Sequence, residues 1–403
     1  MALPFCKIYQ QFGLYILHES FIKSSHATRS YPGVLFLDAS KRSLHFCCSI
    51  EKISSRTFEI KKRSQCGQVL CKSKTHYNDG TFEEGKEEDI SKVTLIWRAI
   101  KLPIYSVALV PLTVGGAAAY LQTGMFSTKR YFVLLASSIL IITWLNLSND
   151  VYDFDTGADK NKKESVVNLV GSRSGTSIAA YLSLGLGFVG LTWTSLGASS
   201  MQAILLLACA ITCGYIYQCP PFRLSYHGLG EPLCFSAFGP FATTAFYLLL
   251  GRTSEMTNLP LTGTVLSVSV LVGFTTSLIL FCSHFHQIEG DRAVRKLSPM
   301  VRLGTERGSY VVKAATITLY SLLLAFGLSR ALPFPCILLC ALTVPTGKLV
   351  VSFVEENHKD KGKIFMAKYY CVRLHALFGT ALAAGLVAAR MLTRKHVPSL
   401  MFS

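Results

Sequence analysis

The sequence predicts an all-α membrane protein with about nine transmembrane helices around a central cavity. Half of the 403 residues are hydrophobic and only 16% are charged, whereas soluble domains carry about 25% charged residues. From about residue 103 onward, apolar stretches of bilayer-spanning length recur between short polar segments. These stretches lack the alternation of barrel strands, so we expect helices.

Short loops rich in Lys and Arg separate the predicted helices. The number of predicted helices depends most on the boundaries of the two closely spaced apolar stretches within 176–217. The helices are expected at about 103–123, 131–149, 176–195, 198–217, 233–250, 262–283, 310–330, 333–352 and 371–390.

The N-terminal segment differs in kind from this membrane portion. Residues 1–75 hold 12 Lys and Arg against four acidic residues, are rich in Ser, and contain no run long enough to span a bilayer. This composition predicts a disordered plastid or mitochondrial transit peptide over 1–75, and a disordered cytosolic tail is the alternative. A polar, acidic linker over 76–98 would then precede a membrane domain at 99–395.

The cysteines and the net charge exclude other classes of protein. Thirteen cysteines are scattered without a C-x-x-C pair, which indicates buried thiols rather than a disulfide framework or a zinc site. The net charge of +17 comes from membrane-flanking loops and the N-terminal segment. Membrane orientation and anionic lipid head groups explain it better than nucleic acid.

Charge asymmetry between the loops predicts the topology. The N-terminal segment and the loops after the second, fourth, sixth and eighth helices carry most of the basic residues of the membrane portion. We expect this face to point toward the stroma, matrix or cytosol. The loops on the opposite side hold only Lys129, Arg130, Arg252 and Arg330.

Two acidic segments on the basic face are the candidate site. The first, NLSNDVYDFDTGAD at 146–159, follows directly on an apolar run, where desolvating a carboxylate costs several kcal/mol or more. If the helix continues, one face carries Asn146, Asn149, Asp150 and Asp153. Asp155 falls off that face, where a solvated carboxylate is expected, and Gly157 lets the chain turn.

The second segment, SHFHQIEGDRAVRK at 283–296, mirrors the first at the end of another helix. Gln287 and Asp291 are four apart and share a helical face, whereas Glu289 points elsewhere. Carboxylates and amides suit a hard cation such as Mg²⁺, and nearby Lys and Arg suit a diphosphate. His284 and His286 would not share a helical face, which argues against zinc. The pattern therefore indicates Mg²⁺ together with a phosphorylated lipid.

These residues resemble a known family. NDVYDFDTGAD resembles the first aspartate-rich motif of the UbiA superfamily of intramembrane prenyltransferases, and its spacing is similar to that of the naphthoate-prenylating (MenA-type) branch. LPIYSVALVPLTVGGAAAY, YHGLGEPLCFSAFGP and QIEGDRAVRKLSPMVRLG resemble further regions of that branch, so the likeness covers about 100–390. One departure is Gln287, which stands where the second motif normally begins with Asp, so that a carboxylate ligand is lost or replaced by an amide oxygen.

The resemblance implies a UbiA-type prenyltransferase bundle that uses Mg²⁺. The implied metal ligands are Asn149, Asp150, Asp153, Asp159, Gln287 and Asp291. Of these, Asp150, Asp153 and Asp291 would be catalytic, and Lys162, Arg292 and Lys296 would neutralise the diphosphate.

The resemblance also implies the reaction and its place in the cell. A prenyl group passes from phytyl diphosphate to a naphthoate or naphthoquinone carboxylic acid, with loss of CO₂, toward phylloquinone. We expect a multi-pass protein of a chloroplast membrane, envelope or thylakoid, with the motif loops facing the stroma. The apolar helices would accept phytyl, geranylgeranyl and solanesyl tails alike.

Two alternatives remain open. Another member of the same superfamily would use homogentisate or a chlorophyll precursor as the acceptor. An ion-coupled transporter also carries intramembrane acids, but near the bilayer midplane, whereas these acids lie at one face beside basic residues.

Overall fold

The structure is a computed structural model that describes residues 102–157, 165–198, 200–252 and 259–395. The predicted transit peptide and acidic linker lie outside the described residues, as do Asp159 and Lys162. The described residues are almost entirely helical and contain no strand, so the all-α prediction is confirmed.

Within the described residues, eight helices are long and apolar enough to cross a membrane, and a ninth span forms if a bent pair is counted as one. The prediction of about nine spans is therefore confirmed. The bent pair consists of α13 (Phe334–Ala341) and α14 (Val344–Asn357), which meet at 42°. The other spans are α3 (Ser106–Thr123), α4 (Thr128–Thr156), α6 (Arg173–Ala198), α7 (Met201–Gln218), the run of α8 (Gly230–Ser236), η3 (Ala237–Thr243) and α9 (Thr244–Gly251), α10 (Gly263–Ser283), α12 (Pro299–Leu328) and α16 (Ala367–Lys395).

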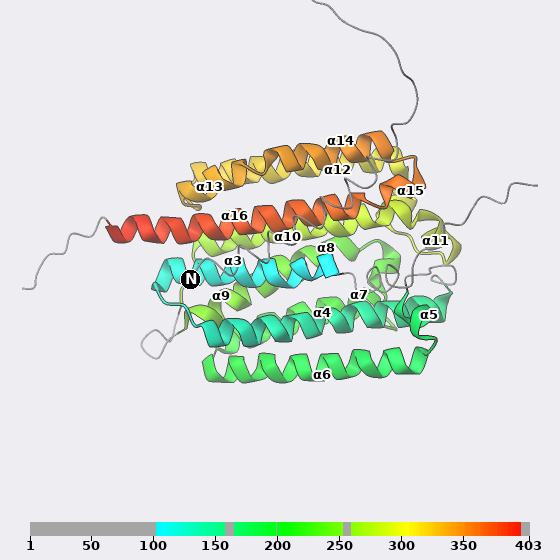
Figure 1. Cartoon of the computed structure of the whole chain (residues 1–403), viewed down its shortest axis with the longest axis horizontal. Helices are drawn as coiled ribbons and strands as arrows, with labels where there is room; N and C mark the ends of the chain where they lie inside the picture. The colour runs from blue at the N-terminus through cyan, green and yellow to red at the C-terminus, as the bar shows by residue number, and fades with distance from the viewer. Residues whose placement is uncertain (1–101, 158–164, 199, 253–258, 396–403) are drawn as a thin grey trace, which may run out of the picture. The chain divides into compact units, whose positions relative to one another are not determined.

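Short helices gather at one end of the bundle. Figure 1 shows α5, α11 and α15 together at this end, which also receives the C-terminus of α4. The connections that the sequence predicts to carry the basic residues thus share one end. The short elements are η1 (Leu102–Tyr105), α5 (Val166–Val170), η2 (Leu224–His227), η4 (His284–His286), α11 (Ile288–Ala293) and α15 (Lys361–Ile364).

Helix α4 carries the first acidic segment as an uninterrupted helix. It begins after Ser127, whose hydroxyl accepts a hydrogen bond from the amide of Arg130, as expected of an N-cap. It ends at Gly157, which has φ of +78° and so adopts the left-handed conformation that glycine favours. The predicted continuation of the helix and the turn at Gly157 are confirmed.

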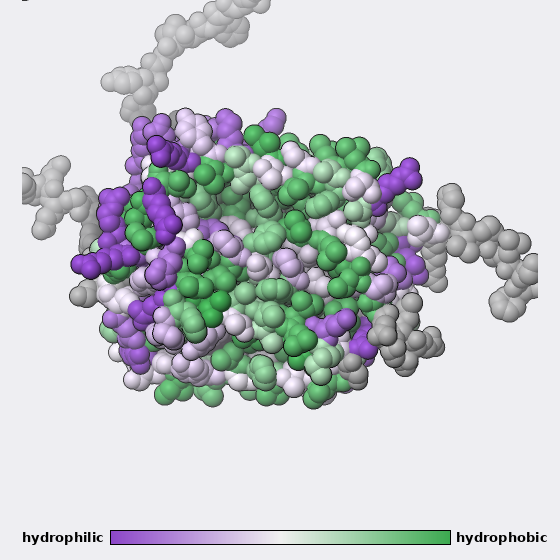
Figure 2. Space-filling view, turned by 180° about the vertical axis from the view of Figure 1, so that it is seen from behind, coloured by the Kyte–Doolittle hydropathy of each residue, from purple (hydrophilic) through white to green (hydrophobic). Residues whose placement is uncertain are grey.

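The core lies where α3, α10 and α16 pack together, with α9 against α3. Leu112, Leu271 and Leu382 from these three helices are fully buried. By contrast, α6 exposes large apolar side chains such as Leu186 and Trp193. In Figure 2 hydrophobic residues cover the middle of the bundle and hydrophilic residues gather mainly at one end, as expected for a protein that spans a bilayer.

The η3 segment packs against α10 through two glycines. A Cβ atom on Gly239 would lie 2.6 Å from the carbonyl oxygen of Ser269 and 2.8 Å from the Cα of Gly273. Gly239→Ala should therefore destabilise the protein by about 1–3 kcal/mol, because backbone atoms must move apart. The measurement is the thermal unfolding midpoint in detergent. Gly185→Ala is the control, because no atom lies within 4 Å of its added Cβ, and equal midpoints would contradict this account of the contact.

Candidate active site

A cavity of about 320 Å³ lies inside the bundle. Most of its wall is apolar and includes Ile141 of α4, Leu207 of α7, Phe238 of η3 and Ile279 of α10. Its polar side chains come from the end of the bundle where the short helices gather. They include Asn146, Asn149, Asp153, His284, His286, Gln287, Lys296 and Lys368.

The first acidic segment contributes to this wall through the last turns of α4. Asn149 donates a hydrogen bond from Nδ2 to Oδ2 of Asp153 over 2.8 Å, and both residues line the cavity. Asp150 is fully buried but is not a lining residue. Its Oδ2 accepts a hydrogen bond from the amide of Val166, which fixes the chain where α5 begins.

Asp155 leaves the face shared by these residues, as its position along the helix predicts. It is exposed and forms a bidentate pair with Arg173, in which Nη2 and Oδ2 are 2.6 Å apart. Its carboxylate therefore belongs to the surface between α4 and α6.

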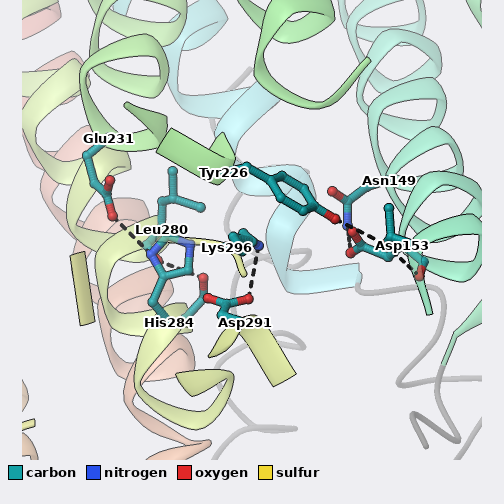
Figure 3. Close-up of polar contacts among 10 residues, drawn as sticks. Asn149, Asp153, Tyr226, Glu231, Leu280, His284, Asp291 and Lys296 are labelled. Carbon is teal, nitrogen blue, oxygen red and sulfur yellow. Dashed lines mark hydrogen bonds and ion pairs between the residues drawn. The ribbon is translucent and has the colours of Figure 1, made fainter. Parts of the chain in front are cut away.

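The second acidic segment contributes a buried ion pair. Lys296 Nζ lies 3.2 Å from Oδ1 of Asp291 (Figure 3), and Lys296 is the member of the pair that lines the cavity. Burial alone would lower the pKa of Lys296, but the carboxylates of Asp291 and Asp153 outweigh burial and raise it. The ammonium group therefore stays charged at neutral pH. Oδ2 of Asp291 is buried without a hydrogen-bond partner among the described residues.

Tyr226 joins the two acidic segments. Its hydroxyl lies 3.1 Å from that of Thr156 at the end of α4, and its carbonyl accepts a hydrogen bond from the amide of Leu297. The ring faces the ammonium of Lys296, 5.7 Å from the centroid. Burial raises the pKa of Tyr226, so its hydroxyl remains protonated at neutral pH. The loop between α7 and α8 thus holds both segments at one cavity mouth.

The predicted site residues fall into three groups. Asn149, Asp153, Gln287 and Lys296 line the cavity, whereas Asp150 and Asp291 are buried and are not lining residues. Arg292 is exposed and is not a lining residue. The described residues contain no cluster of three or more His, Cys, Asp or Glu side chains that could hold a metal by themselves.

Sequence reasoning did not single out Lys368 or Glu231, and it gave His284 no role at the cavity. Lys368 lines the wall, and its ammonium lies 3.9 Å from the centroid of the Phe365 ring. In the sequence this lysine stands just before a predicted helix, where basic residues usually set membrane orientation. His284 also lines the wall and is held by Glu231, at 3.0 Å between Nδ1 and Oε1. The YHGLGEP segment contains Glu231, but the sequence of this segment does not identify His284 as its partner.

A membrane-spanning bundle whose apolar chamber opens beside paired acidic and basic groups is suited to an amphiphile with a charged head. The model of the UbiA prenyltransferase family matches residues 108–372. The chain belongs to the UbiA prenyltransferase family, and the predicted family is confirmed.

Relatives agree with this assignment. The chain is 71% identical over 322 residues to the chloroplastic 2-carboxy-1,4-naphthoquinone phytyltransferase of Arabidopsis thaliana, covering 80% of this chain and 83% of the relative. It is 42% identical over 288 residues to the 2-carboxy-1,4-naphthoquinone phytyltransferase of Synechocystis sp., covering 71% and 91%. The apo structure of a UbiA homolog from Aeropyrum pernix shares the fold, with a TM-score of 0.53 at 15% identity, covering 71% of this chain and 98% of that one.

Proposed function

We propose that the chain transfers the phytyl group of phytyl diphosphate to 1,4-dihydroxy-2-naphthoate, the reduced form of 2-carboxy-1,4-naphthoquinone. Loss of CO₂ then gives the demethylated precursor of phylloquinone. The observation that carries the proposal is the cavity, which joins a long apolar wall to Asp153 and Lys296 at one end. The names of the two relatives supply the substrate class.

The donor atoms at the mouth fit Mg²⁺. They are carboxylate and amide oxygens, and Oδ2 of Asp291 is a buried acceptor whose hydrogen-bonding capacity is not satisfied within the described residues. Mg²⁺ binds through a few carboxylates and takes its remaining ligands from water and substrate phosphates, so a complete protein cage is not needed. Asp153 and Asp291 would hold the ion, with the side-chain oxygen of Asn149 nearby. When bound, the ion would stabilise the charge of the departing diphosphate.

The residues of the chain supply the remaining steps. The ammonium of Lys296 is held between Asp291 and the cavity, where it can face the diphosphate oxygens. The apolar walls from α3, α7 and η3 surround the phytyl tail and exclude water from the allylic carbon. The electron-rich naphthoate ring, and not water, then attacks that carbon. The carboxylate leaves as CO₂, and its bonding electrons restore the aromatic ring.

The protein is expected in a chloroplast membrane with the cavity mouth toward the stroma. The chloroplastic relative and the basic N-terminal segment support the compartment. The basic loops at the mouth end support the orientation.

The test supplies membranes containing the full chain with Mg²⁺, carboxyl-labelled 1,4-dihydroxy-2-naphthoate and phytyl, geranylgeranyl or solanesyl diphosphate. We expect a prenylated naphthoquinol, recovered as the quinone after oxidation by air, and labelled CO₂ only with Mg²⁺, and the highest rate with phytyl diphosphate. Homogentisate is the competing acceptor, and product from it alone would move the chain to another branch of the family. If neither acceptor gave product, the proposed reaction would be wrong.

A further inference from the structure

A carboxylate–imidazole pair lies at the cavity beside the proposed diphosphate site. Glu231 is in the first turn of α8 and His284 directly follows α10. Their side chains are 15% and 4% exposed, and His284 lines the cavity whereas Glu231 is not a lining residue. In Figure 3 the pair stands on the far side of Lys296 from Asp153. No step described so far uses it.

The surrounding backbone holds the pair in place. The hydroxyl of Ser277 donates hydrogen bonds to the carbonyls of Glu231 and Gly273, which ties the first turn of α8 to α10. Glu231 Oε1 lies 3.0 Å from Nδ1 of His284. A carboxylate accepts hydrogen bonds, so Nδ1 is the ring nitrogen that carries a proton. Nε2 is therefore left with its lone pair for a group in the cavity.

This arrangement is the one that makes a histidine a directed proton acceptor. A buried carboxylate fixes the tautomer and the ring orientation, and it stabilises the imidazolium that forms when Nε2 takes a proton. The second oxygen, Oε2 of Glu231, is buried without a hydrogen-bond partner in the described part of the chain. Within the described residues, Nδ1 of His284 is therefore the side-chain hydrogen-bond donor to this carboxylate.

We propose that His284 is a catalytic residue that accepts the proton of a ring hydroxyl of the naphthoate acceptor, and that Glu231 is its positioning residue. This inference rests on the proposed function. Deprotonation makes the ring a stronger nucleophile at the moment when the allylic carbon becomes electrophilic. The same pair can return the proton after the ring has reacted.

Every proton and bonding pair of the proposed transfer step has a defined destination. The O–H proton passes to Nε2, and its bonding pair moves into the ring, from which a ring carbon forms the new C–C bond. The allylic C–O bond breaks, and its pair leaves with the diphosphate. The bond to CO₂ then breaks, its pair returns to the ring, and the ring oxygen takes the proton back from His284. No oxidant or further reactant is required.

The main variant is His284→Gln, whose side-chain amide can still donate to Glu231 but has no basic nitrogen. General base catalysis contributes about 10²–10⁴-fold, so we expect the single-turnover rate of prenyl transfer to fall by that factor. The affinity for phytyl diphosphate, measured without acceptor, should be unchanged, because the proposed diphosphate-binding residues Asp153 and Lys296 are intact. His358→Ala is the matched control, since His358 binds Thr305 and does not line the cavity.

Two further measurements separate a catalytic role from a structural one. Added imidazole should restore prenyl transfer in His284→Ala. In Glu231→Gln, transfer to a ring-fluorinated acceptor, whose hydroxyl is more acidic, should be slowed less relative to wild type than transfer to the native acceptor. If His284→Gln kept the native single-turnover rate, or if imidazole and fluorination changed nothing, the proton-acceptor role would be wrong. Wild-type membranes that prenylate no naphthoate would instead overturn the proposed function itself.

Discussion

Asp153→Ala is expected to abolish prenyl transfer while the protein still folds and inserts. Asp153 is half-buried, lines the cavity at the end of α4, and acts electrostatically on Lys296. Its loss would remove one of the two carboxylates proposed to hold Mg²⁺ beside the diphosphate. Removing one group that stabilises transition-state charge costs roughly 100- to 1,000-fold in rate, and loss of the ion would cost more.

The measurement is the turnover of purified protein at saturating Mg²⁺, together with the Mg²⁺ concentration that gives half-maximal rate. Asp155→Ala is the matched control, because Asp155 lies two residues away on the same helix but pairs with Arg173 at the surface. We expect Asp155→Ala to retain most of the activity. Near-normal turnover of Asp153→Ala would remove this carboxylate from the proposed metal site.

The fold was largely predictable because bilayer-spanning helices require long apolar runs that are visible in the sequence. Apolar runs of sufficient length identified the spans, and each predicted span has a counterpart in the described helices. The break between α13 and α14 was not predicted, although Pro345 in the first turn of α14 is a local signal for it, because proline disfavours continuation of a helix from the preceding residues. The π-helical segment η3 was also missed, although it contains Pro240, which has no amide proton for the regular hydrogen bonding of an α-helix.

The site was only partly predictable. Helical spacing placed Asn149 and Asp153 on one face and correctly set Asp155 apart. The same spacing put Asp150 on that face, yet its carboxylate turns to the amide of Val166, a partner that only the return of the chain provides. Arg292 and Lys296 were equivalent in the sequence, but Arg292 lies on an exposed face of α11, whereas the turn after α11 buries Lys296.

The Glu231–His284 pair shows why the remainder could not be predicted. The two residues are 53 positions apart, and neither belongs to an aspartate-rich motif. Their contact depends on how the first turn of α8 packs against the end of α10, where Ser277 meets the backbone of Glu231. Spacing along one helix carries no information about such a contact.

Lys296→Gln is expected to affect both stability and catalysis. Lys296 is charged and buried, and it compensates Asp291 and Asp153. Removing one partner of a buried ion pair leaves an uncompensated charge and costs about 3–5 kcal/mol. We therefore expect a lower thermal unfolding midpoint in detergent and a loss of turnover, whereas Lys296→Arg should keep most of the stability.

The double variant Lys296→Gln with Asp291→Asn separates the two effects. It removes both charges of the pair, so most of the lost stability should return, because a neutral buried pair leaves no ion uncompensated. Turnover should stay low, since the cavity then lacks the ammonium for the diphosphate and one carboxylate for the ion. The comparison uses unfolding midpoints and single-turnover rates of the wild type, both single variants and the double variant. Recovery of activity along with stability would show that the pair is purely structural, and the proposed role of Lys296 at the diphosphate would be wrong.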